Sequence, residues 1–444
     1  MPETNDASAL ARPSRKYDDA GGRAAAGDHE SRLSSVAPLL LILGCSVRTL
    51  GDLLVQKNAY AKENTMNPRW LSRLLLGPAF VLMVTMTARS DGGHEHEGHE
   101  HEFVQTNLVS DIPGLAAITD AELVNSWGVS HSPTSPFWVS NQGKNTTTLY
   151  AVTDATKVSK VIINPPTGFV LIPTTAQGPQ GPTGQVSNVN ASSFLVKNGG
   201  DGGPAHFIFA NLNGTISAWD AGTTAFIQVT TPGALYTGLA TNGAQTQLYA
   251  ANGGGTGSVD VFDSTFAPVS LASGAFVDPC LPAGLVPFNV ADISGDVYVT
   301  YAPAGHAAQT SAPLGAGAVA IFDESGNFIK ELVGGRRLAA PWGITLAPPS
   351  FGRFGSDLLI GNFSYLHSEI NVFDPASGKF LGTLPIDIGN NHPGGLWTLA
   401  FGVGGSNGSP DTLYFTDGIN GEMDGLFGAI SPKETPKPDC RRRP

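Results

Sequence analysis

Charged residues are scarce in this chain of 444 residues, and basic ones are the scarcest, with 25 Lys and Arg against 37 Asp and Glu. The formal net charge is therefore −12. Nucleic-acid binding depends on clustered Lys and Arg that neutralise phosphates, so this balance argues against a nucleic-acid partner. The short basic run Arg441-Arg442-Arg443 lies near the C-terminus and is typical of a solvated tail.

Cysteine is also rare, with 3 residues in the whole chain. Two of them, Cys280 and Cys440, would remain after removal of the export signal described below. In an oxidising compartment two cysteines can form one disulfide, but two free thiols fit equally well. The sequence contains no Cys-x-x-Cys pair and no phosphate-binding loop, so it gives no direct support for zinc-ribbon or nucleotide chemistry.

The apolar run at residues 74–86 is too short to span a bilayer comfortably. It follows two arginines and precedes small residues, with a cleavage point expected after Ala88 or Ser90. This order is typical of a secretory signal peptide, which we assign to residues 66–90. We therefore expect a secreted or periplasmic protein with no transmembrane span in its mature form. Residues 1–65 show no sustained periodicity, and we interpret them as a disordered extension or as the product of a misassigned start codon.

Residues 91–102 form a His/Glu-rich linker between this leader and the body of the chain. Imidazole and carboxylate groups at such density can bind Zn²⁺, Ni²⁺ or Cu²⁺, although a flexible tract gives no fixed geometry. A solvated low-complexity linker is an equally good interpretation. The candidate metal ligands are His94, His96, His99 and His101.

Glycine is abundant, with 55 residues, and a short apolar strand that ends in a polar residue recurs six times, as in Phe137-Trp138-Val139-Ser140-Asn141. A short segment such as Trp127-Gly128-Val129 precedes each copy, and it contains Gly in four of the six. In a propeller we expect this segment to be the innermost strand, beside the central channel, where Gly lets backbones approach closely. An alternating strand such as Ser258-Val259-Asp260-Val261-Phe262-Asp263 follows each copy. Similar units spaced roughly 40 to 70 residues apart predict a β-propeller with six blades, rather than a β-sandwich or a β-helix. We place the propeller at residues 103–432 and a disordered tail at residues 433–444.

The strand count predicts how the ring closes. The units near residues 237–271, 288–332 and 342–384 hold four strands each, whereas the last unit, at residues 396–430, holds three. Residues 103–109, directly after the leader, are the natural source of the missing outer strand. Such a strand would remove a sheet edge on which neighbouring molecules could pair. We therefore predict an all-β, six-bladed β-propeller closed by an N-terminal latch strand.

Several of these motifs resemble a known family. Asn125-Ser126-Trp127-Gly128-Val129, Leu396-Trp397-Thr398-Leu399-Ala400-Phe401-Gly402 and the Gly-rich block at residues 418–428 resemble an uncharacterised family of secreted bacterial six-bladed β-propeller proteins. Some members of that family end in a PEP-CTERM sorting tail, which the C-terminal residues of this chain do not match. More distantly, the chain is similar to NHL-repeat and gluconolactonase-like propellers. The resemblance implies a propeller fold and export, and it implies no established reaction.

The polar residues that end the six strand copies are the first candidate site. In equivalent strands their side chains converge near one mouth of the central channel. Amide and carboxylate oxygens suit Ca²⁺ or another divalent cation, and the resemblance to gluconolactonase-like propellers implies a central metal site with Glu, Asn and Asp ligands. Asn also caps strand ends, so a structural role is the alternative. The residues concerned are Asn141, Asn211, Asn252, Tyr301, Asn362 and Asp417.

A further candidate is the pair Glu422 and Asp424, with His392 before it in the sequence. Carboxylates at this spacing can act as acid/base groups, or they can accept backbone hydrogen bonds in a loop.

No catalytic motif stands out, and the loops of the predicted blades are unequal, notably at residues 164–182 and 302–317. Propellers recognise partners through such loops. We therefore predict a monomeric, non-catalytic module of the cell envelope or exterior that binds an extracellular or periplasmic ligand or protein. The alternative is a metal-assisted lyase or hydrolase, lactonase-like, with its site at the channel mouth.

Overall fold

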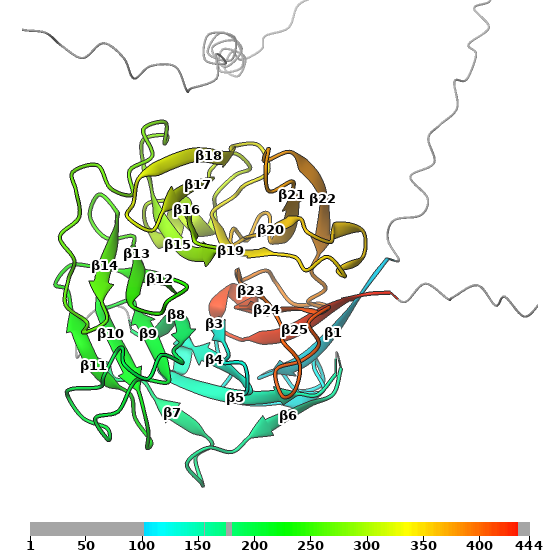
Figure 1. The fold of residues 1–444 in the computed structure, drawn as a ribbon. Helices are drawn as coiled ribbons and strands as arrows, with labels where there is room; N and C mark the ends of the chain where they lie inside the picture. Colours follow the sequence, from blue (N-terminus) through cyan, green and yellow to red (C-terminus); the bar gives the residue numbers. More distant parts are fainter. Residues whose placement is uncertain (1–101, 155, 175–179, 434–444) are drawn as a thin grey trace, which may run out of the picture. The chain divides into compact units, whose positions relative to one another are not determined.

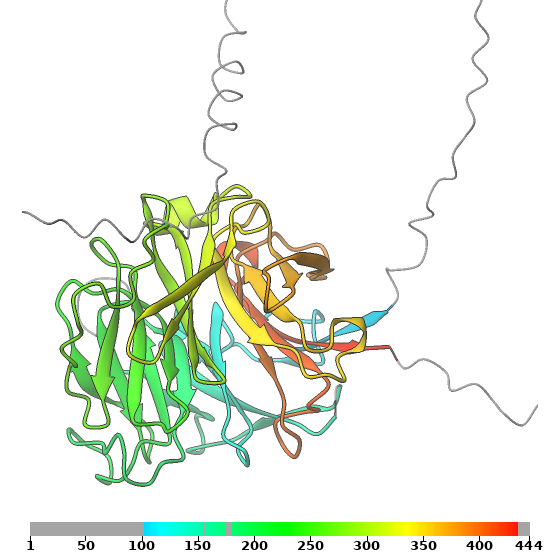
Figure 2. The ribbon, with the colours of Figure 1, turned by 45° about the horizontal axis from the view of Figure 1, so that its top comes forward.

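The computed structural model describes residues 102–154, 156–174 and 180–433. In this part of the chain the strands β1 to β25 form six sheets, which are arranged as blades around a common centre (Figures 1 and 2). Neighbouring strands within a blade are antiparallel, apart from the short parallel pair β1 and β2. The predicted six-bladed β-propeller is confirmed.

The blades are numbered along the chain, and their strands are given from the innermost outward. Blade 1 consists of β3 (Ser126–Ser130), β4 (Phe137–Asn141), β5 (Thr146–Val152), β6 (Val158–Val161) and β7 (Phe169–Leu171), which pairs with β5. Blade 2 consists of β8 (Pro182–Ser187), β9 (Phe207–Asn211), β10 (Thr215–Trp219) and β11 (Phe226–Thr230). Blade 3 consists of β12 (Tyr236–Thr241), β13 (Gln247–Asn252) and β14 (Ser258–Asp263).

The remaining blades follow the same order. Blade 4 consists of β15 (Leu285–Ile293), β16 (Asp296–Pro303), β17 (Ala318–Asp323) and β18 (Phe328–Gly334). Blade 5 consists of β19 (Pro341–Leu346), β20 (Leu358–Asn362), β21 (Glu369–Phe373) and β22 (Phe380–Pro385). Blade 6 consists of β23 (Leu396–Phe401), β24 (Leu413–Asp417), β25 (Leu426–Pro432), β1 (Phe103–Ser110) and β2 (Ile118–Thr119).

The innermost strands form a closed ring. Each of β3, β8, β12, β15, β19 and β23 contacts the innermost strand of the next blade, and β23 contacts β3. Glycine permits this approach: a Cβ atom on Gly184 would lie 2.6 Å from the backbone nitrogen of Leu239 in the next blade. The segment that precedes each strand copy is therefore the strand that borders the channel, as expected, and four of the six contain Gly.

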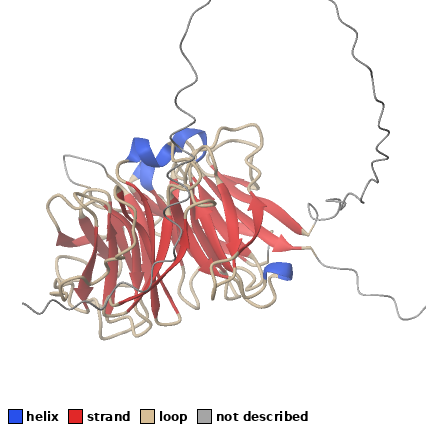
Figure 3. Ribbon diagram, turned by 90° about the horizontal axis from the view of Figure 1, so that it is seen from above, coloured by secondary structure: helices blue, strands red, loops and turns tan. Residues whose placement is uncertain are grey.

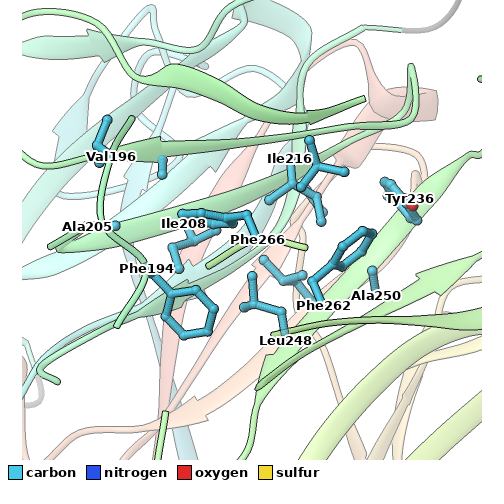
Figure 4. Close-up of a cluster of buried hydrophobic side chains, with 14 of the residues drawn as sticks. Phe194, Val196, Ala205, Ile208, Ile216, Tyr236, Leu248, Ala250, Phe262 and Phe266 are labelled. Carbon is cyan, nitrogen blue, oxygen red and sulfur yellow. The ribbon is translucent and has the colours of Figure 1, made fainter. Parts of the chain in front are cut away.

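The hydrophobic core lies between neighbouring blades, because each strand presents alternate side chains to its two sides. In β13, Leu248 and Ala250 pack with blade 2 (Figure 4), whereas Tyr249 and Ala251 pack with blade 4. Both faces of the sheet are therefore buried, which explains why the strands are apolar at nearly every position.

The latch strand is present as predicted. β1 pairs antiparallel with β25, from Phe103 opposite Pro432 to Ser110 opposite Leu426, so it supplies the outer strand that the last unit lacks. It ends one residue later than expected. Figure 1 shows β1 and β25 lying side by side although they come from opposite ends of the described chain.

Blade 3 corrects one expectation, because it has three strands where four were predicted. Residues after β14 do turn back along it: Val269 N donates to Val261 O, and Phe262 forms an isolated bridge with Pro268. Proline has no backbone N–H to continue a ladder, and the chain then leaves the sheet. The half of β14 that contains Val259 consequently has no outer strand beside it.

Helical segments in the described part are short and lie in the connections between strands (Figure 3). They are η2 (Gln142–Lys144), α1 (His306–Thr310), η3 (Gly352–Phe354) and α2 (Ile419–Glu422). No helix among the described residues is long and apolar enough to cross a membrane.

The packing of β1 generates a test of the closure. Leu108 is fully buried, whereas Val104 in the same strand is 49% exposed. Leu108→Ala should lower the free energy of unfolding by about 3 kcal/mol, because it leaves a cavity under the latch. Val104→Ala should cost less than about 0.5 kcal/mol. Denaturant unfolding of both variants measures this, and equal costs would contradict a latch that is packed into the core.

Candidate functional site at the channel mouth

Three tryptophans from three blades fill the middle of the channel. Trp127 and Trp397 stack with their ring centroids 3.4 Å apart, and Trp342 meets both edge-on at 6.3 and 5.7 Å. Trp342 Nε1 donates to the backbone oxygen of Thr237 at 2.9 Å, and Trp397 Nε1 donates to Asn125 Oδ1 at 3.0 Å. We call this group the tryptophan plug.

The plug has a cavity on either side. The smaller, of about 100 Å³, lies among later residues of the innermost strands, such as Val129 and Leu399. The larger, of about 280 Å³, lies where these strands begin, and Trp127 and Phe288 belong to its wall. We call the larger one the mouth cavity. Because the plug lies between the two, the mouth cavity is a cup and not one end of an open pore.

Two short helices bring ionisable groups to the mouth cavity. α1, in the connection between β16 and β17, contributes His306 and Gln309, and α2, between β24 and β25, contributes Glu422. His306 Nε2 lies 2.8 Å from Glu422 Oε2, so blades 4 and 6 are joined across the cavity. The hydrogen bond to Glu422 and the charge of Glu422 outweigh partial burial and raise the pKa of His306 above its usual value.

The backbone of α2 explains how Glu422 reaches this position. Asn420, Gly421 and Glu422 all have positive φ, of 56°, 68° and 68°. A non-glycine residue in this region costs of order 1 kcal/mol, and such strain clusters where a side chain must point in a defined direction. The turn directs Glu422 toward His306, and the Glu422 side chain is only 15% exposed.

Two polar atoms of this site have no hydrogen-bond partner among the described residues. They are Trp127 Nε1, on a residue that is 4% exposed, and Glu422 Oε1. A buried donor or acceptor without a partner costs roughly 1–3 kcal/mol. One is a donor and the other an acceptor, and both residues line the mouth cavity. The wall of the cavity therefore holds one unpartnered donor and one unpartnered acceptor.

Asp417 lies close by and is buried between blades 5 and 6. It shares a face of β24 with Leu413 and Phe415, which pack against blade 5. Asp417 is 1% exposed, and neither carboxyl oxygen has a hydrogen-bond partner among the described residues. Burial raises the pKa of Asp417 to about 7. Burial, the charges of Glu422 and Asp417, and a hydrogen-bond interaction with Glu422 raise the pKa of Tyr365.

The amides predicted to surround the mouth are engaged elsewhere. Asn141 Nδ2 donates to the hydroxyls of Thr146 and Thr148, both at 3.1 Å. Asn362 Nδ2 donates to the backbone oxygen of Arg337 at 3.0 Å. These bonds join the end of the second strand to neighbouring segments of the chain.

The other four members of the predicted ring are also dispersed. Asn211 and Asn252 each donate to side chains of the third strand in their own blade. Tyr301 lines a different cavity, between blades 3 and 4, and Asp417 is buried as described above. None of the six lines the mouth cavity, and their role as ligands stays a prediction. In the described part of the chain no group of three or more His, Cys, Asp or Glu could hold a metal ion.

Several other predicted positions lie outside the described residues. They are the signal peptide at 66–90, Cys440, and the histidines His94, His96, His99 and His101. Cys280 does have an interaction partner. Its pairing with Cys440 stays a prediction.

The carboxylate pair separates into two environments. Glu422 faces His306 of blade 4 and not His392, whereas Asp424 accepts a hydrogen bond from Asn420 Nδ2 at 2.8 Å. Burial and the charge of Asp424 raise the pKa of Asp111 to about 6.

Sequence reasoning missed His306, although the long connection at residues 302–317 that carries it was the available signal.

One run of the sequence, Gly404-Gly405-Ser406-Asn407-Gly408, fits the Gly-x-Ser-x-Gly pattern of hydrolases. A nucleophile elbow places that serine on a sharp turn from a strand into a helix. Here the run lies in the connection between β23 and β24, and Asn407 Nδ2 donates to backbone oxygens of Ser132 and Ser135. Its role is therefore to fasten blade 6 to blade 1.

Comparison with known proteins identifies relatives without a stated activity. No family model matches the chain. It is 26% identical over 340 residues to "Uncharacterized protein R648" of Acanthamoeba polyphaga mimivirus, covering 73% of this chain and 78% of that protein. It is 25% identical over 341 residues to "Uncharacterized protein L690" of the same virus, covering 73% and 84%. These relatives are viral, and the likeness to a bacterial family stays a prediction.

Solved structures give more distant likenesses. They include the hydrazine synthase of Kuenenia stuttgartiensis, with 17% identity, a TM-score of 0.42, and 68% of this chain and 76% of that chain covered. A luciferin-regenerating enzyme matches with 12% identity, a TM-score of 0.44, and 74% and 95% covered. A virginiamycin B lyase from Staphylococcus aureus matches with 11% identity, a TM-score of 0.42, and 75% and 100% covered. These values are too low to carry an inference about function.

Asp417 generates a prediction about pH. Its folded-state pKa of about 7 exceeds the ordinary value of 3.8 for an aspartate, so between these values the folded protein holds a proton that the unfolded chain has lost. The free energy of unfolding should therefore fall as the pH rises through this window, by roughly 4 kcal/mol from this group. Asp417→Asn should remove that fall, which urea unfolding from about pH 4 to pH 9 measures.

A matched control is Asp374→Asn in the turn after β21. Hydrogen bonds from Ser377 lower the pKa of Asp374, so its carboxylate keeps one charge throughout the window. This control should leave the pH dependence between about pH 5 and pH 8 unchanged. A curve for Asp417→Asn parallel to that of the unmodified protein would contradict the raised pKa.

Proposed function

We propose that this protein is an exported β-propeller that binds a small organic molecule in its mouth cavity. The observation that carries the proposal is the pair of unpartnered polar atoms, Trp127 Nε1 and Glu422 Oε1, in the wall of an otherwise largely apolar cup. A ligand with a hydrogen-bond acceptor for Trp127 and a donor for Glu422 would satisfy both. Its apolar body would lie against the rings of Trp127 and Phe288.

The size of the cup limits the ligand. A volume of about 280 Å³ is close to the lower end of ordinary ligand pockets, roughly 300–1,000 Å³. The tryptophan plug closes the inner end, so a polymer cannot thread through the channel. These features favour a compact molecule over an extended chain.

The proposed location and state follow from the sequence. Export is supported by the predicted signal peptide at residues 66–90, and a secreted or periplasmic protein would meet its ligand outside the cytoplasm. The monomeric state is supported by the latch, since a ring closed by its own strand needs no partner to complete it.

A second candidate function is a lyase or hydrolase at the same cavity, and the His306–Glu422 pair favours it. Imidazole and carboxylate at 2.8 Å can exchange a proton with a substrate, and the left-handed backbone holds Glu422 in place. The metal-assisted form of this reaction needs ligands that the described residues do not bring together at the mouth. The second candidate is therefore general acid–base catalysis by His306 and Glu422.

The binding function is tested by screening small organic molecules for an increase in melting temperature and titrating each hit. Trp127→Phe and Glu422→Gln should each weaken binding of a true ligand about 10-fold or more, because each removes one hydrogen bond in a desolvated site. Trp138→Phe is the matched control, since Trp138 is buried against Phe207 between blades 1 and 2. Hits that bind all three variants equally would place the ligand elsewhere.

The same hits distinguish the enzyme from the binding module. If the pair is catalytic, hits are converted to product, and His306→Gln abolishes turnover while the ligand still binds. Stable, unconverted ligand in the unmodified protein supports the binding module. Mass spectrometry of the recovered ligand gives the answer.

A further inference from the structure

A second cavity, which we call the interblade pocket, lies between blades 3 and 4. Its volume is about 390 Å³. It borders the part of β14 that has no outer strand, near Val259, and the residues that follow β14 form much of its apolar wall. Leu271, Phe276 and Leu281 belong to this wall. The pocket shares no lining residue with the mouth cavity.

Two polar atoms in the interblade pocket are buried without a hydrogen-bond partner among the described residues. They are Tyr301 Oη, on a residue that is 2% exposed, and Asp278 Oδ2, on a residue that is 6% exposed. The other oxygen of Asp278 accepts the backbone N–H of Cys280 at 2.8 Å. Burial raises the pKa of Tyr301, and the two residues are close enough for the charge of Asp278 to raise it further.

The pocket is also strongly acidic. Asp260 lines it, and Glu331 of β18 lies beside Asp278. Burial, the charge of Asp278 and a hydrogen bond that protonated Glu331 donates to Asp278 raise the pKa of Glu331, and burial raises the pKa of Asp278. In the described part of the chain, none of these three carboxyl groups forms an ion pair with Lys or Arg. Asp260 has neutral partners, the hydroxyls of Tyr236 and Ser258 and the amide of Asn252. Three carboxyl groups thus lie beside an apolar wall, and no Lys or Arg among the described residues pairs with them.

A positively charged ligand would give the two unpartnered oxygens a hydrogen-bond donor and would balance the charge of the carboxyl groups. Ammonium groups carry three N–H donors and no acceptor, so one such group can donate to Asp278 Oδ2 and Tyr301 Oη together. Charge-assisted hydrogen bonds of this kind are roughly twice as strong as neutral ones. A metal ion is a poorer match, because the described residues hold no group of three or more candidate side-chain ligands for one.

We propose that the interblade pocket binds a small organic molecule with a primary ammonium group on an apolar body. The ammonium group donates to Asp278 Oδ2 and Tyr301 Oη, and the apolar body packs against Phe276 and Leu281. This site is independent of the mouth cavity and of the function proposed for it.

The test uses 2-phenylethylamine as the probe and 2-phenylethanol as its neutral counterpart, titrated into the full chain near neutral pH. The amine should bind and raise the melting temperature, and the alcohol should bind at least about 10-fold more weakly, because it lacks the charge. Equal affinities for the two probes would overturn the proposal. So would the absence of binding by the amine and by a linear alkylamine such as hexylamine.

Variants locate the probe. Tyr301→Phe removes a hydroxyl that has no partner, so it should fold normally and still weaken amine binding severalfold. Asp278→Asn should weaken it about 10-fold or more, and circular dichroism checks that this variant folds. Glu422→Gln, in the mouth cavity, should leave amine binding unchanged. Binding that survives Tyr301→Phe and Asp278→Asn but is lost in Glu422→Gln would place the amine at the mouth and overturn this proposal while leaving the mouth site standing.

Discussion

The pairing of β1 with β25 is the constraint on which the rest of the molecule depends. Six blades form a ring only if the innermost strand of the last blade meets that of the first, and the backbone bonds between Phe103–Ser110 and Leu426–Pro432 complete that last blade. The mouth cavity draws its wall from blades far apart in the sequence. Its central contact, between His306 of blade 4 and Glu422 of blade 6, exists only when the ring is closed. The site is therefore a product of closure and not of any single blade.

The tryptophan plug determines what the channel can do. Without it, the start and the end of the innermost strands would face one continuous space. With Trp127 and Trp397 stacked in the middle, the two ends become separate compartments, and one of them is large enough for a ligand. Asn125 takes part twice, because it accepts from Trp397 and donates to Gln142 at the cavity wall. Asn125 thus links the tryptophan plug to the polar wall of the mouth cavity.

Much of the fold could be predicted from the sequence, because it depends on local and repeated signals. Six copies of an apolar strand, a similar short strand before each and a missing outer strand in the last unit were enough to predict the blades and the latch. Blade 3 departed from the pattern because the segment around Pro268 cannot continue a ladder. In the sequence this segment resembles a fourth strand, but in the structure Val269 donates one backbone hydrogen bond to Val261 and the chain then leaves the sheet.

The candidate site was harder to predict, because it depends on how the connections between strands fold over the channel. Asn141 and Asn362 mark the repeat clearly, but their amides are engaged in joining strands to neighbouring segments. His306 belongs to no repeat, and nothing in its own sequence neighbours indicates that it meets Glu422, 116 residues later. The turn that directs Glu422 contains two non-glycine residues with positive φ, a conformation that propensity does not predict.

The latch also determines how the ring would respond to tension. Phe103 lies opposite Pro432, so the first residue of β1 and the last residue of β25 lie together at one end of this antiparallel pair. A force that pulls the two ends apart would load the hydrogen bonds one pair at a time, as a zipper opens, and not all together in shear. A pull on one end alone, with blade 6 held, would instead slide β1 along β25 against every bond of the pair. The latch should therefore withstand a pull on one terminus, which loads all of its hydrogen bonds together, better than a pull that separates the two termini.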